Sequence, residues 1–125
     1  MAHAPADDTR FQTGRVVALA GGHAVHDGYA AFLPPLLPLF VERLSLSNAG
    51  AGLLSAFTQV PALLQPVVGH LADRRDLRLA VIVAPGVGGV VMSSLGWADH
   101  YALLAVLLVA AGINIATLHA VGPPA

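Results

Sequence analysis

The charged residues of this 125-residue chain fall into a few clusters, and the gaps between clusters are long enough to cross a lipid bilayer. Four stretches, 16–41, 44–72, 79–98 and 101–125, contain no Lys, Arg or Glu and only one Asp. A hydrocarbon core of about 30 Å is crossed by about 20 apolar residues in an α-helix. The sequence therefore predicts an all-α membrane protein with four transmembrane helices near 16–40, 48–71, 79–98 and 101–122.

Composition excludes the main alternatives to a membrane bundle. Charged residues make up 10% of the chain and hydrophobic residues 56%, whereas soluble domains carry about 25% charged residues. So few charges cannot cover a water-soluble globule, and so much apolar surface cannot stay solvated as a disordered chain. Barrel strands alternate apolar and polar residues, but the run from Tyr101 to Ala111 does not alternate.

The same composition limits the chemistry that we expect. Because there is no cysteine, the chain has neither a disulfide framework nor a thiolate metal site. A net charge of −1 and the absence of lysine argue against a nucleic-acid partner. The sequence shows no catalytic constellation, so we do not expect an enzyme, and we expect no cofactor.

Arginines predict the orientation of the helices. Five of the six lie before the first helix or between the second and third, and only Arg43 lies in the first loop. Under the positive-inside rule, this bias places the amino terminus in the cytoplasm of a multi-pass protein of the inner or plasma membrane. We divide the chain into a polar cytoplasmic terminus, 1–14, and a transmembrane domain, 15–125.

Local signals support these boundaries. The hydroxyl of Ser47 can cap the second helix. Prolines fall late in the first helix and within the second, where neighbouring helices can tolerate them. Small residues four apart, such as Gly112 and Ala116, either allow helices to approach closely or reflect only the abundance of Gly and Ala.

Asp27 is the most informative single residue. It lies near the middle of the first predicted helix, where a carboxylate costs roughly 2.5–3.5 kcal/mol on insertion scales. His23 lies one turn earlier on the same face. This pair is either a proton-coupling site or a hydrogen-bonded pair that only locks helix packing. His26 and Tyr29 are expected to face a neighbouring helix or a water-filled cavity.

Other histidines and polar residues leave alternatives open. His23, His26 and Asp27 could be metal ligands, but His26 and Asp27 point about 100° apart on a helix, so we predict no metal site from them. In the fourth helix, Asn114 and His119 either line a substrate path or make hydrogen bonds between helices.

The segment from Gly69 to Arg78 carries a family resemblance. It resembles the major facilitator superfamily signature Gly-x-Leu-Ala-Asp-Arg-x-Gly-Arg-Arg/Lys, with Asp76 in place of the glycine and Leu77 in place of the first basic residue. The matching residues are Gly69, Leu71, Ala72, Asp73, Arg74 and Arg78. Two further segments are similar to fosmidomycin-resistance-type exporters: Gly22-His23 with Asp27, Tyr29 and Leu33-Pro34, and Leu64-Gln65-Pro66 followed by Gly69.

The resemblance implies a proton-coupled antiporter that performs efflux of a small molecule or drug. It implies that Asp27 and His23 face the central cavity, and that Asp73 of the loop signature (Gly69, Asp73, Arg74 and Arg78) holds the two halves together. Such transporters have two six-helix halves, so the chain is expected to be a fragment with the amino-terminal part of the bundle. Its expected partners are the lipid bilayer, protons, a small-molecule substrate and a missing carboxy-terminal half.

Three other classes remain open. A small four-helix multidrug exporter acting as a dimer has a similar length, although the arginine bias argues against it. A non-transporting membrane subunit would use Asp27 to pair with a partner helix. An intramembrane metal- or haem-binding protein would use His23 or His26 together with His119.

Overall fold

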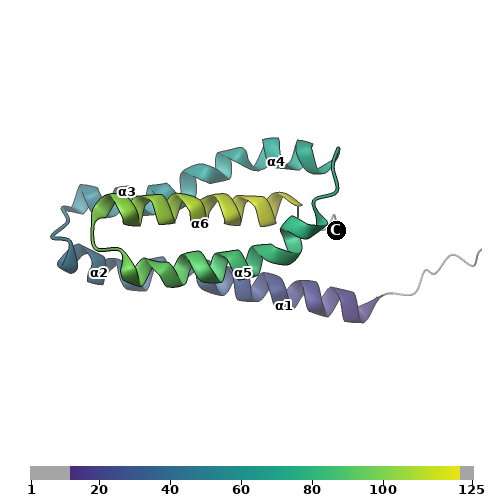
Figure 1. The fold of residues 1–125 in the computed structure, drawn as a ribbon, viewed down its shortest axis with the longest axis horizontal. Coiled ribbons are helices and arrows are strands. Elements are labelled where there is room, and N and C mark those ends of the chain that lie inside the picture. Colours follow the sequence, from purple (N-terminus) through teal and green to yellow (C-terminus); the bar gives the residue numbers. More distant parts are fainter. Residues whose placement is uncertain (1–11, 122–125) are drawn as a thin grey trace, which may run out of the picture.

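The computed structural model describes residues 12–121, and every regular element in that range is a helix. Predicted features at 1–11 and 122–125 lie outside the described residues. Figure 1 shows the elongated bundle that the helices form. The elements are α1 (Thr13–Ala30), α2 (Leu33–Arg43), α3 (Asn48–Gln59), η1 (Val60–Leu64), α4 (Gln65–Ala72), α5 (Arg78–Ser94), η2 (Leu95–Trp97) and α6 (Tyr101–Val121).

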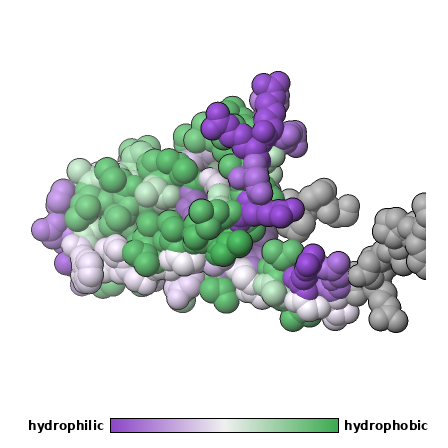
Figure 2. Space-filling model, turned by 45° about the vertical axis from the view of Figure 1, so that its right-hand side comes forward, coloured by the Kyte–Doolittle hydropathy of each residue, from purple (hydrophilic) through white to green (hydrophobic). Residues whose placement is uncertain are grey.

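Three segments of the described range are long and apolar enough to cross a membrane: Asn48–Ala72, Arg78–Trp97 and Tyr101–Val121. They correspond to the second, third and fourth predicted helices. Many large apolar side chains on them face outward, among them Leu63, Ile82 and Val106. Figure 2 shows this apolar surface along the bundle, with hydrophilic residues gathered toward its ends. Over residues 12–121 the protein is all-helical, and it has the features of a multi-pass membrane protein.

The first predicted helix, 16–40, is interrupted in the structure. The α-helical pattern is interrupted at Ala31 and Phe32, so this stretch is divided between α1 and α2. Pro34 and Pro35 have no N–H to donate to the carbonyls four residues earlier, which breaks the helical hydrogen-bond ladder there. Neither part is among the three candidate spans, and the predicted count of four spans is not confirmed.

Prolines also alter the hydrogen bonding of the second span, Asn48–Ala72, which nevertheless remains continuously helical. Pro66 lacks an N–H, and the carbonyl of Ala62 instead accepts a hydrogen bond from the N–H of Gln65, one residue earlier. This tighter pattern produces the 3₁₀ turn η1 between α3 and α4. At the start of the span, the Ser47 hydroxyl accepts a hydrogen bond from the Gly50 N–H at 3.1 Å, which confirms the predicted cap.

Helix α6 is the centre of the packing. It contacts α5 most extensively, and it also contacts α3, η1, α4 and α1. Figure 1 shows α6 between the layer of α3 and α4 and the layer of α5 and α1. The buried apolar cluster joins α6 to α2, α3 and α5, and it includes Leu104, Leu108, Leu54 and Phe40. The position of any polar group on α6 is therefore fixed by several neighbours at once.

Gly112 of α6 allows one of these contacts to be unusually close. A Cβ atom built at Gly112 would lie 2.6 Å from the carbonyl oxygen of Thr58 and 2.8 Å from Cγ of Pro61. Both obstacles belong to rigid parts of the second span, so neither can move aside at low cost. Of the two interpretations of this small residue, close helix approach is the one that the structure supports.

We expect Gly112→Ala to destabilise the protein by about 1–3 kcal/mol, because the added methyl group must displace backbone atoms. The measurement is unfolding in detergent micelles by circular dichroism. Gly52→Ala is the matched control, since a Cβ at Gly52 meets nothing within 4 Å. Equal stability of the two variants would contradict the close contact.

Candidate functional site

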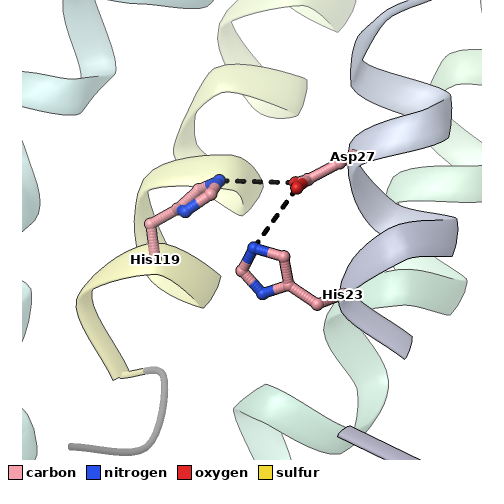
Figure 3. A group of neighbouring side chains, drawn as sticks. All are labelled: His23, Asp27 and His119. Atoms are coloured by element: carbon pink, nitrogen blue, oxygen red, sulfur yellow. Dashed lines mark ion pairs between the residues drawn. The ribbon is translucent and has the colours of Figure 1, made fainter. Parts of the chain in front are cut away.

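A carboxylate and two imidazoles meet between α1 and α6. Nε2 of His23 lies 3.3 Å from Oδ2 of Asp27, and Nε2 of His119 lies 3.5 Å from Oδ1 of the same residue. The two imidazole rings are edge to face, with centroids 5.0 Å apart. Figure 3 shows the three side chains pointing toward a common point. We call His23, Asp27 and His119 the ionisable trio.

The local fold explains how the trio assembles. His23 and Asp27 are four residues apart on α1, so they lie on the same face of that helix. His119 comes from the last turn of α6, almost one hundred residues later in the chain. The side chains of the trio are between 37% and 48% exposed, so the site is open on one side.

His26 lies beside the trio but belongs to the helix interface. It is 1% exposed, and neither ring nitrogen has a hydrogen-bond partner among the described residues. The ring packs against Gly88 of α5, where a Cβ would lie 3.3 Å from Nδ1 of His26 and 2.9 Å from Nδ2 of Asn114. Gly88 thus makes room for two polar side chains from two different helices. One turn further along α1, the ring of Tyr29 lies against Gly89.

Asn114 links α6 to α5. Its Nδ2 donates a hydrogen bond to the carbonyl oxygen of Ala84 at 3.0 Å. Of the two interpretations that the sequence left open for Asn114, the bond between helices is the one that the geometry supports. His119, the other residue of that pair, instead faces α1 within the trio.

The loop with the signature residues lies at one end of the bundle. Gly69 is in α4, Asp73 follows the end of α4, Arg74 is in the loop, and Arg78 begins α5. Asp73 and Arg78 line a groove of about 1150 Å³ together with residues of α1 and α6.

The replacement of the signature glycine by Asp76 is compatible with this loop. Oδ1 of Asp76 accepts a hydrogen bond from the N–H of Arg78 at 3.0 Å. Ser45 alone among the described non-glycine residues has a positive φ, so the backbone at Asp76 does not need glycine.

Comparison with protein-family models, curated proteins and solved structures finds no match to this chain. The resemblance of 21–78 to major facilitator exporters therefore remains a prediction from sequence motifs. What the site can do has to be argued from its own geometry. An acid and two imidazoles around one point can bind and release protons or hold a cation.

The sequence predicts the His23–Asp27 pair, and it connects His119 with His23 or His26 only in the metal- or haem-binding alternative; it does not predict the contact of His119 with Asp27. Sequence spacing carries no information on contacts between distant helices, so it cannot place His119 beside Asp27. One signal was available: His119 is the only residue of 101–125 with an ionisable side chain other than Tyr101. A lone ionisable group in an apolar helix usually has a partner on a neighbouring helix.

The contact between α1 and α6 can be tested by crosslinking, because the chain contains no native cysteine. We expect the double variant Asp27→Cys/His119→Cys to be linked within one chain by a short bifunctional maleimide, as detected by mass spectrometry after proteolysis. Leu63→Cys combined with Asp27→Cys is the control, because Leu63 lies with Ile113 on another side of α6. Equal yields from the two pairs would show that α6 does not present His119 to α1.

Proposed function

We propose that the chain is part of a secondary active membrane transporter that couples the efflux of a small molecule to proton entry. The observation that carries this proposal is the ionisable trio, since it places Asp27 between two imidazoles on helices of an apolar bundle. Ionisable groups within membrane-spanning bundles are rare and mark ion or substrate pathways by default.

The depth of the trio supports a role in transport. His26, the neighbour of Asp27, packs against Gly88, about halfway along the candidate span Arg78–Trp97, whereas His119 lies in the last turn of α6. The trio therefore extends from the middle of the bundle toward the end at which α6 terminates. An Asp at the centre of a membrane-spanning helix costs roughly 2.5–3.5 kcal/mol on insertion scales, and a position nearer the end of the bundle costs less. Helix packing alone does not require that cost, because the apolar cluster around α6 already holds the bundle together.

The exposed side of the trio supports access to water or to a substrate. About half of the Asp27 side chain is exposed. Placing an ionisable group against lipid costs free energy. We propose that this side faces a central water-filled cavity, completed by further helices of a major facilitator-type bundle. In that arrangement the amino terminus and the 73–78 loop are cytoplasmic, and Asp73 contacts the carboxy-terminal half.

The proposal predicts that Asp27→Asn abolishes proton movement coupled to drug addition, because the amide cannot carry a proton. The purified chain is reconstituted in liposomes that contain a pH-sensitive dye. Ethidium and fosmidomycin serve as a cationic and an anionic probe. We expect pH changes for the native chain and a return to the level of empty liposomes for the variant.

Asp99→Asn is the matched control, because Asp99 is an exposed acid in the loop before α6, away from the trio. It should move protons as the native chain does. Native protein that moves no protons with either probe would instead favour a non-transporting membrane subunit, or a part of a transporter that is inactive without the remaining helices. Equal losses in both variants would show that Asp27 has no special part in coupling.

A further inference from the structure

We propose that the ionisable trio is a binding site for a divalent first-row transition metal ion of the zinc class. The inference goes beyond the proposed function, because a metal site can exist whether or not the chain transports anything. It rests on the geometry of three ligand atoms from two helices.

The two distances between imidazole nitrogen and carboxylate oxygen, which involve different oxygens of Asp27, are close to the ligand spacing around a bound metal ion. One ligand atom from each residue can be chosen so that all three lie within 4.8 Å of one another. The closest approaches to the carboxylate, 3.3 and 3.5 Å, are longer than the usual 2.7–2.9 Å of a charge-assisted hydrogen bond. Zinc binds imidazole nitrogen and carboxylate oxygen at about 2.0–2.2 Å, so two ligands of a tetrahedral ion lie about 3.3–3.5 Å apart.

The ligand types select the class of metal. Two imidazoles and one carboxylate suit zinc, cobalt, iron or nickel, whereas calcium and magnesium prefer all-oxygen sites. The open side of the trio leaves a fourth position for water or for a ligand, because each side chain remains partly exposed. Three protein ligands with one open position form an exchangeable site rather than a closed structural one.

The charges of the three side chains are also compatible with a bound cation. Both ion pairs of Asp27 within the described residues involve histidines. Without a metal, an imidazole must carry a proton on its Nε2 in order to donate to the carboxylate. With a metal between them, both imidazoles and the carboxylate contribute lone pairs to one cation, and the carboxylate charge is neutralised.

His26 is not one of the proposed metal ligands. The rings of His26 and His119 have centroids 6.3 Å apart, and the His26 ring is buried against Gly88 and Asn114. The sequence argued against a metal site because the adjacent residues His26 and Asp27 point in different directions. The proposed site does not use that pair. His119 takes the place of His26 as the third ligand.

The first test is equilibrium binding of zinc and cobalt to the purified chain in detergent, without a histidine tag and after treatment with a chelator. We expect one ion per chain by calorimetry. His119→Ala and Asp27→Asn should each weaken binding by at least about tenfold, since the first removes one of three ligands and the second replaces the charged carboxylate with a neutral amide. His70→Ala and His100→Ala, which change exposed histidines outside the trio, should bind as the native chain does.

The second test gives a spectroscopic signature that a purely structural effect cannot produce. Because the chain has no cysteine, His119→Cys introduces the only thiol. With cobalt it should show a thiolate-to-metal charge-transfer band in the near ultraviolet, while His70→Cys should show none. Circular dichroism checks that each variant keeps its helices.

The inference is overturned if the native chain binds less than one ion. It is also overturned if a folded His119→Ala variant binds as tightly as native protein, or if cobalt gives no charge-transfer band with His119→Cys. Neither measurement uses a gradient or a drug. A failure of metal binding is thus distinguishable from a failure of drug-coupled proton movement in liposomes.

Discussion

A carboxylate on an apolar helix has to find its partners within the protein, and Asp27 finds them where α1 meets α6. Asp27 meets one imidazole from its own helix and a second from α6. The rest of α6 is held by α3, η1, α4 and α5. The trio is therefore a property of the whole packing of α6, rather than a local feature of α1.

The same requirement for partners applies to the backbone and to neutral polar groups. Prolines in the first and second predicted helices remove backbone N–H donors. The helical pattern is interrupted at Ala31–Phe32 in the first helix and replaced by the 3₁₀ turn η1 in the second. At the α5–α6 interface, Asn114 donates to the Ala84 carbonyl, and the missing side chain at Gly88 leaves the space that this amide and His26 occupy. Close packing and polar contacts thus depend on each other here.

Helix class, the three candidate spans and the Ser47 cap could be predicted from the sequence, because they follow from apolar length and from chemistry within a few residues. The break in the first helix could not, since prolines kink some membrane helices and end others according to what their neighbours supply. The His23–Asp27 pair was likewise visible as a spacing of four residues on one helix. The contact of His119 with Asp27 was not predicted, because it depends on where α6 lies against α1, which is a result of packing and not of local pattern.

The two helices of the trio are joined unequally to the rest of the protein, and this affects what the trio can do. α1 packs mainly on α5, and its contacts with α6 are few apart from the trio. A cation or proton bound by all three side chains would therefore favour the arrangement in which α1 lies against α6. A shift of α1 by only about 1 Å would spoil the spacing needed for a shared ion. If the proposed binding occurs, occupancy of the site and the position of α1 are linked, and such a linkage is what a binding site needs in order to take part in a conformational cycle.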